Sequence, residues 1–220
     1  MLETIEQQTA ETVHGSVIWL HGLGASGEDF ADVLPMLGLD PGLGLRFIFP
    51  HAPVMPVTVN NGYPMRAWYD IYGIGAQFSD DAEGIRRSSR QVQELIAREH
   101  SRGITSAQVV LAGFSQGGAV SLYTGTRSPQ PLAGLLGLST YLPLPELLGS
   151  EKSDVSLQTP IMLMHGTEDT VVPVEFSRMT YRPLYALGYQ VEWKEYNMPH
   201  TVCAQQLQDI GAWLNGLFAR

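Results

Sequence analysis

The sequence has 220 residues, of which 44% are hydrophobic and 16% are charged, and this composition excludes an intrinsically disordered chain. The 13 basic and 22 acidic residues give a net charge of −9, which argues against nucleic acid or an anionic membrane surface as a partner. The single cysteine, Cys203, cannot form an internal disulfide, and the first residues are acidic where a signal peptide is basic and then apolar. We therefore expect a cytoplasmic protein. The apolar runs fall far short of the ~20 residues that cross a bilayer, so we expect no stable membrane insertion.

Short apolar runs, each ended by glycine or proline, predict buried strands along the chain. Residues 1–14 come first and read as a polar N-terminal arm. The predicted strands then follow at 16–20, 46–49, 108–111, 134–138 and 161–164. These runs do not alternate cleanly, which favours strands covered on both faces, as in a parallel sheet. Residues 189–196 do alternate, so we place this last strand near a sheet edge.

Helical spacing of apolar residues separates these strands. One helix begins at Asp80 or Asp81 and is stopped by Gly103, and a shorter one follows Ser115. Two more are predicted over 174–187, where Pro183 would kink the helix, and over the last residues of the chain. The alternation predicts an α/β fold: one domain over 1–220, with a mostly parallel central sheet and helices on both faces. No insertion is long enough for a large lid domain.

A serine lies in a tight turn between a predicted strand and a predicted helix. The pattern G-x-S-x-G is formed by Gly113, Ser115 and Gly117. Such a turn is strained, and glycines on both sides of the serine let neighbouring backbone approach. The serine hydroxyl then projects above the sheet, near the positive end of the helix. The turn predicts that Ser115 is a nucleophile.

A serine nucleophile needs a base, and the base needs an acid that holds it. In hydrolases with this turn the chain order is Ser, then Asp or Glu, then His. His200 follows every candidate acid and lies in a loop after the last strand, whereas His165 precedes the best acid. Glu168 and Asp169 both qualify as that acid, and we prefer Asp169 because it directly precedes the turn into 171–173.

The glycine-rich loop after the first buried strand, HGLGASG at 21–27, is a second functional element. In such hydrolases this loop supplies one of two oxyanion-binding amides. By position we assign the amides of Leu23 and Gln116 to an oxyanion hole, and we expect His21 to order the loop.

Two nucleotide-binding patterns overlap these segments. Gly22, Gly24 and Gly27 form the dinucleotide pattern G-x-G-x-x-G, but Glu28 and Asp29 would lie where the pyrophosphate charge must be accommodated. A dinucleotide-binding enzyme therefore stays a remote alternative. A phosphate-binding loop at 113–118 fails because alanine replaces the required lysine, and no paired-cysteine or H-E-x-x-H metal site is present in the sequence.

With these residues in place, the chain resembles the carboxylesterase/acyl-protein thioesterase (phospholipase/carboxylesterase) family of α/β-hydrolases over almost its full length, and its bacterial carboxylesterase branch most. The resemblance rests on HGLGASG at 21–27, PHAP at 50–53, RAWYD at 66–70, GFSQGG at 113–118, HGTED at 165–169 and PH at 199–200. It implies a serine carboxylesterase that hydrolyses short- to medium-chain acyl esters or thioesters through an acyl-enzyme, with no cofactor and no metal. Acyl-protein thioesterase and lysophospholipase activities are the alternatives.

The resemblance also implies that Met65, Trp68, Tyr141 and Val172 line the acyl site. Many relatives carry tryptophan where this chain has Tyr141, which leaves acyl-length preference open. The expected partner is a small-molecule acyl ester or thioester, and the sequence leaves a homodimer open. A hydrolase-fold binding module without catalysis is the remaining alternative.

Overall fold

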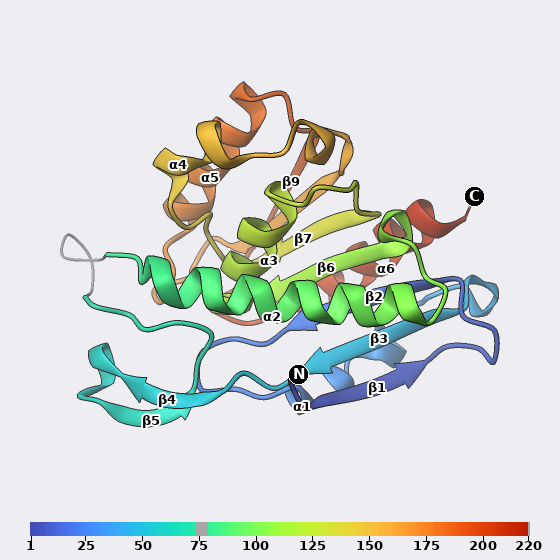
Figure 1. Cartoon of the computed structure of the whole chain (residues 1–220), viewed down its shortest axis with the longest axis horizontal. Coiled ribbons are helices and arrows are strands. Elements are labelled where there is room, and N and C mark those ends of the chain that lie inside the picture. Colours follow the sequence, from blue (N-terminus) through green and yellow to red (C-terminus); the bar gives the residue numbers. More distant parts are fainter. Residues whose placement is uncertain (74–78, 220) are drawn as a thin grey trace.

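A seven-stranded, mostly parallel sheet forms the centre of the computed structural model, which describes residues 1–73 and 79–219 (Figure 1). In spatial order the strands are β1 (Thr4–Gln8), β3 (Leu45–Pro50), β2 (Gly15–Leu20), β6 (Val109–Phe114), β7 (Gly134–Leu138), β8 (Ile161–Gly166) and β9 (Val191–Tyr196). Only β1 runs antiparallel to its neighbour, β3. The predicted parallel sheet is confirmed, and β9 lies at its edge as the alternating pattern indicates.

Two strand regions were not predicted. The residues expected to form a polar arm contain β1, a half-buried edge strand. Its polar composition gave no sign that it pairs with β3. A separate hairpin of β4 (Val54–Val57) and β5 (Tyr63–Arg66) follows β3. It contains two prolines, a residue type that sequence reasoning excludes from central strands.

Helices cover both faces of the sheet (Figure 1). One face carries α2 (Ala82–Ser101), α3 (Gln116–Thr126), α4 (Pro145–Glu151) and α5 (Val174–Ala186), and the other carries α1 (Glu28–Ala31) and α6 (Ala204–Phe218). Alternate residues of each strand enter opposite cores: Ile18 packs in the core under α2, whereas Val17 packs in the core under α6. This explains why the buried strands carry apolar residues on both faces and do not alternate with polar ones.

Short 3-10 turns complete the connections. They cover Leu34–Met36, Pro41–Leu43, Thr58–Asn60, Ser106–Gln108 and Asp154–Gln158. The α2 helix begins where the sequence predicts, since the Asp81 side chain accepts a hydrogen bond from the Gly84 amide at 2.9 Å. Pro183 lies inside α5, which continues for three more residues.

The strand order reverses next to β2, which has β3 on one side and β6 on the other. In doubly wound sheets, ligands bind at the carboxyl ends of strands beside such a reversal. The loops that follow β2, β6, β8 and β9 therefore meet at the end of the sheet formed by the carboxyl ends of the strands.

At the opposite end of the sheet, near the starts of β2 and β3, a buried carboxylate links α2 to the strands. Glu99 has no exposed side-chain surface; it accepts a hydrogen bond from the Ser16 hydroxyl and pairs with Arg46 at 2.7 Å and Arg102 at 3.1 Å. Arg102 also pairs with Glu6 of β1 at 2.8 Å. A buried charge that loses its partner is strongly unfavourable, so this cluster fixes α2 against β1, β2 and β3.

We expect Glu99→Ala to lower the free energy of unfolding by about 3 kcal/mol, because Arg46 would be left buried without its carboxylate. The matched control on the same helix is Glu94→Ala: Glu94 is 56% exposed and pairs only loosely with the N-terminus at 3.9 Å. The control should change stability by no more than about 0.5 kcal/mol. Urea denaturation measures both values, and equal effects would contradict the role given to the buried cluster.

Candidate active site

Ser115 occupies the turn between β6 and α3 in a backbone conformation that L-residues rarely adopt, with φ 54° and ψ −122°. The close approach of neighbouring backbone holds it there. A Cβ on Gly113 would lie 2.4 Å from the carbonyl carbon of Gly117, and a Cβ on Gly117 would lie 2.4 Å from the carbonyl oxygen of Leu20. Two glycines are therefore required by packing, and the serine between them is held above the sheet.

His200 lies in the loop between β9 and α6, and its two ring nitrogens face two different partners. Nε2 is 3.1 Å from the Ser115 hydroxyl oxygen, and Nδ1 is 2.6 Å from Oδ2 of Asp169. The ring packs on Phe114, with centroids 4.7 Å apart. Because a carboxylate only accepts hydrogen bonds, Nδ1 carries the proton and Nε2 faces the hydroxyl as an acceptor.

Asp169 follows β8 and is 6% exposed. Its second oxygen, Oδ1, accepts hydrogen bonds from the amides of Val171 at 2.9 Å and Val172 at 2.8 Å. Glu168, the other candidate acid, is exposed. The structure thus brings Ser115, His200 and Asp169 within hydrogen-bonding distance in the predicted order, while their catalytic roles stay a prediction.

The two amides predicted for the oxyanion hole both belong to residues that line the same pocket as Ser115. Gln116 is the first residue of α3, so its N–H has no partner within the helix. Leu23 is the second residue of a turn closed by the Ala25 amide and the Gly22 carbonyl at 3.2 Å, while the Gly24 amide donates to Arg66 at 2.8 Å. Neither bond uses the N–H of Leu23.

His21 is fully buried beneath this loop and orders it. Its Nδ1 lies 2.7 Å from the Gly22 carbonyl, and its Nε2 accepts from the Ala52 amide at 3.0 Å. Burial lowers the pKa of His21 to about 4, so the ring is neutral near pH 7. The contacts match the expected ordering role, and His21 does not line the pocket.

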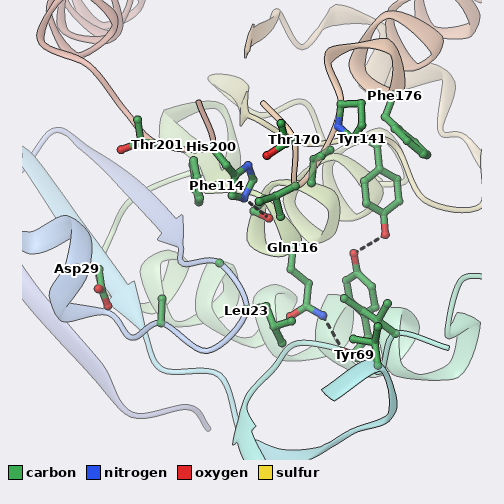
Figure 2. A pocket seen from close by; sticks show the side chains of 18 of the residues that line it. Leu23, Asp29, Tyr69, Phe114, Gln116, Tyr141, Thr170, Phe176, His200 and Thr201 are labelled. Carbon is green, nitrogen blue, oxygen red and sulfur yellow. Dashed lines mark hydrogen bonds between the residues drawn. The ribbon is translucent and has the colours of Figure 1, made fainter. Parts of the chain in front are cut away.

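A pocket of roughly 800 Å³ lies between the loops at this end of the sheet, and Ser115 is one of its lining residues. Figure 2 shows other residues of its wall, among them His200 and Gln116. Most of its wall is apolar. Its walls include Phe30, Phe114, Ile71, Val59, Val171, Val172 and Phe176. A cavity of this size and lining accommodates an apolar chain next to a reactive polar group.

Two tyrosines from different loops face each other across this pocket (Figure 2). The hydroxyls of Tyr69 and Tyr141 are 2.8 Å apart, and Tyr141 also lies 3.4 Å from the Asp80 carboxylate. Burial raises the pKa of both phenols, so both are neutral. The pair places polar atoms in a mostly apolar wall without adding charge.

The four residues predicted to bind substrate divide into two groups. Tyr141 and Val172 line the pocket, whereas Met65 and Trp68 lie outside its wall. Trp68 has no exposed surface and donates from its indole to the His21 carbonyl at 2.9 Å, so it supports the oxyanion loop from behind. Contact of Met65 and Trp68 with substrate therefore stays a prediction, because a sequence motif marks a loop but not which of its side chains points into the pocket.

Sequence reasoning missed several wall residues, among them Tyr69, Phe114 and Phe176. Tyr69 and Phe114 lie inside the motifs RAWYD and GFSQGG, which was the available signal; Phe176 lies on α5, away from any motif. Within 1–73 and 79–219, no cluster of three or more histidine, cysteine or acidic side chains could hold a metal ion. Across the same ranges, none of the helices has the length and hydropathy needed to cross a membrane.

Comparison with known proteins agrees with this geometry. Residues 3–217 match the Phospholipase/Carboxylesterase family. The chain is 38% identical to acyl-protein thioesterase 1 of Gibberella zeae over 90% of this chain and 88% of that protein. It is 45% identical to acyl-protein thioesterase 1 of Schizosaccharomyces pombe over 72% of this chain and 70% of the relative.

Solved structures give the same result for the fold. Acyl-protein thioesterase 2 of Zea mays superposes with a TM-score of 0.87 at 28% identity, covering 99% of this chain and all of that one. The Arabidopsis thaliana SOBER1 structure has a TM-score of 0.87 at 29% identity over 93% of this chain and 99% of its own. The α/β-hydrolase fold predicted from the sequence is confirmed, and so is the serine hydrolase class. The chain belongs to the phospholipase/carboxylesterase family of α/β-hydrolases.

Proposed function

We propose that this protein hydrolyses short- to medium-chain acyl esters and thioesters, with Ser115 as nucleophile, His200 as general base and Asp169 as the acid that holds it. The observation that carries the proposal is the continuous contact from Ser115 through His200 to Asp169, 3.1 Å and 2.6 Å long. A serine hydroxyl reacts poorly until a base accepts its proton, and this arrangement supplies the base in the right tautomer. A cytoplasmic location and a small-molecule substrate form part of the same proposal.

The first step is attack of the Ser115 oxygen on the acyl carbonyl, with the hydroxyl proton passing to Nε2 of His200. The amides of Leu23 and Gln116 would stabilise the oxyanion that forms, and the α3 N-terminus adds partial positive charge. His200 then donates the proton to the departing alcohol or thiol, leaving Ser115 acylated. Water, activated by the same nitrogen, releases the acid and restores the serine. Asp169 stays ionised and stabilises the transient imidazolium.

A second candidate is hydrolysis of S-acylated proteins. The relatives at 38% and 45% identity are named acyl-protein thioesterase 1, which favours this narrower activity. Esters and thioesters present the same carbonyl to the same groups, so the triad does not discriminate between them. This second candidate is supported if kcat/KM is higher for an S-acylated peptide than for a p-nitrophenyl ester with the same acyl chain.

The triad is tested with a fluorophosphonate probe and mass spectrometry. We expect one adduct on Ser115, and no labelling in Ser115→Ala or His200→Ala, because the hydroxyl needs its base. The kcat of Ser115→Ala should fall by about 10⁴-fold or more. Ser121 is the matched control: it lies on α3 and is buried, but its hydroxyl donates to the Ala112 carbonyl at 3.0 Å, so Ser121→Ala should be labelled normally. A folded wild-type protein that stays unlabelled would instead favour a binding module.

The lowered pKa of His21 predicts a pH-dependent stability. The pKa is about 4 in the folded protein against an ordinary 6.5, so the unfolded chain binds more protons between these values. The contribution of neutral His21 to the free energy of unfolding is therefore fully present above pH 6.5. It falls by about 3 kcal/mol as the pH drops to 4.

His21→Asn should lower the stability at pH 7 but flatten its decline between pH 6.5 and 4. Denaturant unfolding at several pH values measures both slopes. The variant keeps a smaller slope of the same sign, since burial also lowers the pKa of His165. Identical slopes for the two proteins would show that His21 is not buried in its neutral form.

The Tyr69–Tyr141 pair predicts the acyl-length preference. Removing the ring in Tyr141→Ala enlarges the pocket, so kcat/KM for long p-nitrophenyl esters should rise relative to short ones by about tenfold, the scale of one or more methylenes in an apolar pocket. Tyr63→Ala is the control, because Tyr63 is 68% exposed on β5 and lies outside the pocket. An unchanged chain-length profile in Tyr141→Ala would show that this ring does not contact the acyl chain.

A further inference from the structure

A second histidine contacts the proposed catalytic acid from outside the pocket. His165 is the fifth of six residues in β8, has no exposed surface and does not line the pocket. Its Nε2 lies 2.7 Å from the Val172 carbonyl and 3.3 Å from Oδ2 of Asp169. Its Nδ1 lies 2.6 Å from the Ser177 hydroxyl of α5. The proposed reaction gives this buried, polar ring no chemical step.

Hydrogen-bond accounting determines which nitrogen carries the proton. Nε2 faces a carbonyl and a carboxylate, both of which only accept, so Nε2 must be protonated. Burial lowers the pKa of His165, so the ring is neutral near pH 7 and Nδ1 is an acceptor. The Ser177 hydroxyl then faces two acceptors, Nδ1 of His165 and the Thr140 carbonyl. It shares its single proton between them.

This tautomer completes the surroundings of Asp169. Oδ1 accepts from two backbone amides, and Oδ2 faces the N–H groups of two imidazoles, His200 and His165. Three hydrogen bonds hold the carboxylate, and the 3.3 Å contact with Nε2 of His165 gives Oδ2 a second polar neighbour that opposes its rotation. His165 also binds the Val172 carbonyl, so it ties the carboxylate to the turn that supplies its amides.

Hydrogen bonds also connect His165 to the backbone of Ser115. Thr140, whose carbonyl accepts from Ser177, donates from its own hydroxyl to the carbonyl of Ser115 at 2.6 Å. A hydrogen-bonded path therefore runs from His165 through Ser177 and Thr140 to the backbone of Ser115, and the 3.3 Å contact between His165 and Asp169 joins this path to the carboxylate. It joins β8, α5, the end of β7 and the nucleophile turn behind the pocket.

We infer that His165 is a positioning residue for the reaction: its Nε2–H fixes the Asp169 carboxylate and moderates the negative charge that Asp169 presents to His200. The inference rests on the proposed function. Without this donor, the carboxylate would attract a proton on His200 more strongly and would be free to turn. His200 would then be protonated, and inactive as a base, at a higher pH.

The titratable groups that contact Asp169, among the residues the structure describes, are His200 from the loop before α6 and His165 from β8. The other groups around these rings are uncharged. They are Ser177 on α5, the backbone of Val171 and Val172, Ser115 and the Phe114 ring. A change in the pH profile therefore reports on the two histidines and the carboxylate.

The test compares two substitutions that place an amide nitrogen differently. In His165→Gln the side-chain nitrogen reaches the position of Nε2, whereas in His165→Asn it reaches only that of Nδ1. We expect His165→Asn to lower kcat about tenfold with KM within about threefold, and to move the acidic limb of the kcat/KM profile upward by about 0.5–1 pH unit. His165→Gln should restore most of the loss and the wild-type profile. His100→Gln, on the exposed end of α2, is the control and should match the wild type.

Wild-type kcat and pH profile in His165→Asn would overturn the inference, as would equal defects in the Asn and Gln variants. A second measurement needs no variant: nitrogen-15 NMR of the wild type at pH 7 should show His165 as the neutral Nε2–H tautomer. A bare Nε2 would overturn the inference, since nothing would then be donated to Asp169. Failure of the proposed function is distinguishable, because it would appear as activity retained in Ser115→Ala.

Discussion

The close packing of backbone around the turn at Ser115 is the constraint on which the rest of the site depends. Gly113 and Gly117 leave no room for side chains, and β6 turns tightly into α3 at Ser115, whose φ is 54°. Such strain persists only where surrounding structure fixes it, and here β2, β6 and the first turn of α3 do so. The consequence is a hydroxyl raised above the sheet, a free helix-terminal amide beside it, and a position that loops from β8 and β9 can reach.

A set of hydrogen-bond donors surrounds the buried carboxylate of Asp169, behind the proposed triad. Burying a charge is costly unless donors replace its hydration. Asp169 receives two backbone amides and faces two imidazoles, so its charge is satisfied without a cationic side chain. A lysine or arginine at this position would neutralise the carboxylate and weaken its hold on an imidazolium. Neutral donors preserve the negative charge for His200 while holding the carboxylate in one orientation.

The pocket combines the same two properties, apolar lining and neutral polar groups. Its wall consists mostly of apolar side chains, and the Tyr69–Tyr141 pair contributes hydroxyls that stay protonated because burial raises the pKa of each. Such a wall suits the uncharged acyl chain of the proposed substrates, and the Ser115–His200 contact lies within the same pocket. At the other edge of the sheet, the buried Glu99 cluster carries the structural ion pairs, far from the loops that hold the site.

The sequence alone determined the α/β class, all six of the parallel strands to within a few residues, and the order Ser115, Asp169, His200, because apolar periodicity and a strand–turn–helix motif are local properties. Strand β1 escaped prediction because its pairing with β3, not its polar composition, makes it a strand. The direction of side chains at the ends of different strands decides which residues form the pocket wall. It also decides that Trp68 lies behind the loop at 21–27 and supports it. The role of His165 is likewise invisible in the sequence: β8 places its ring under Asp169, but only the packing of α5 gives that ring the partners that fix its tautomer.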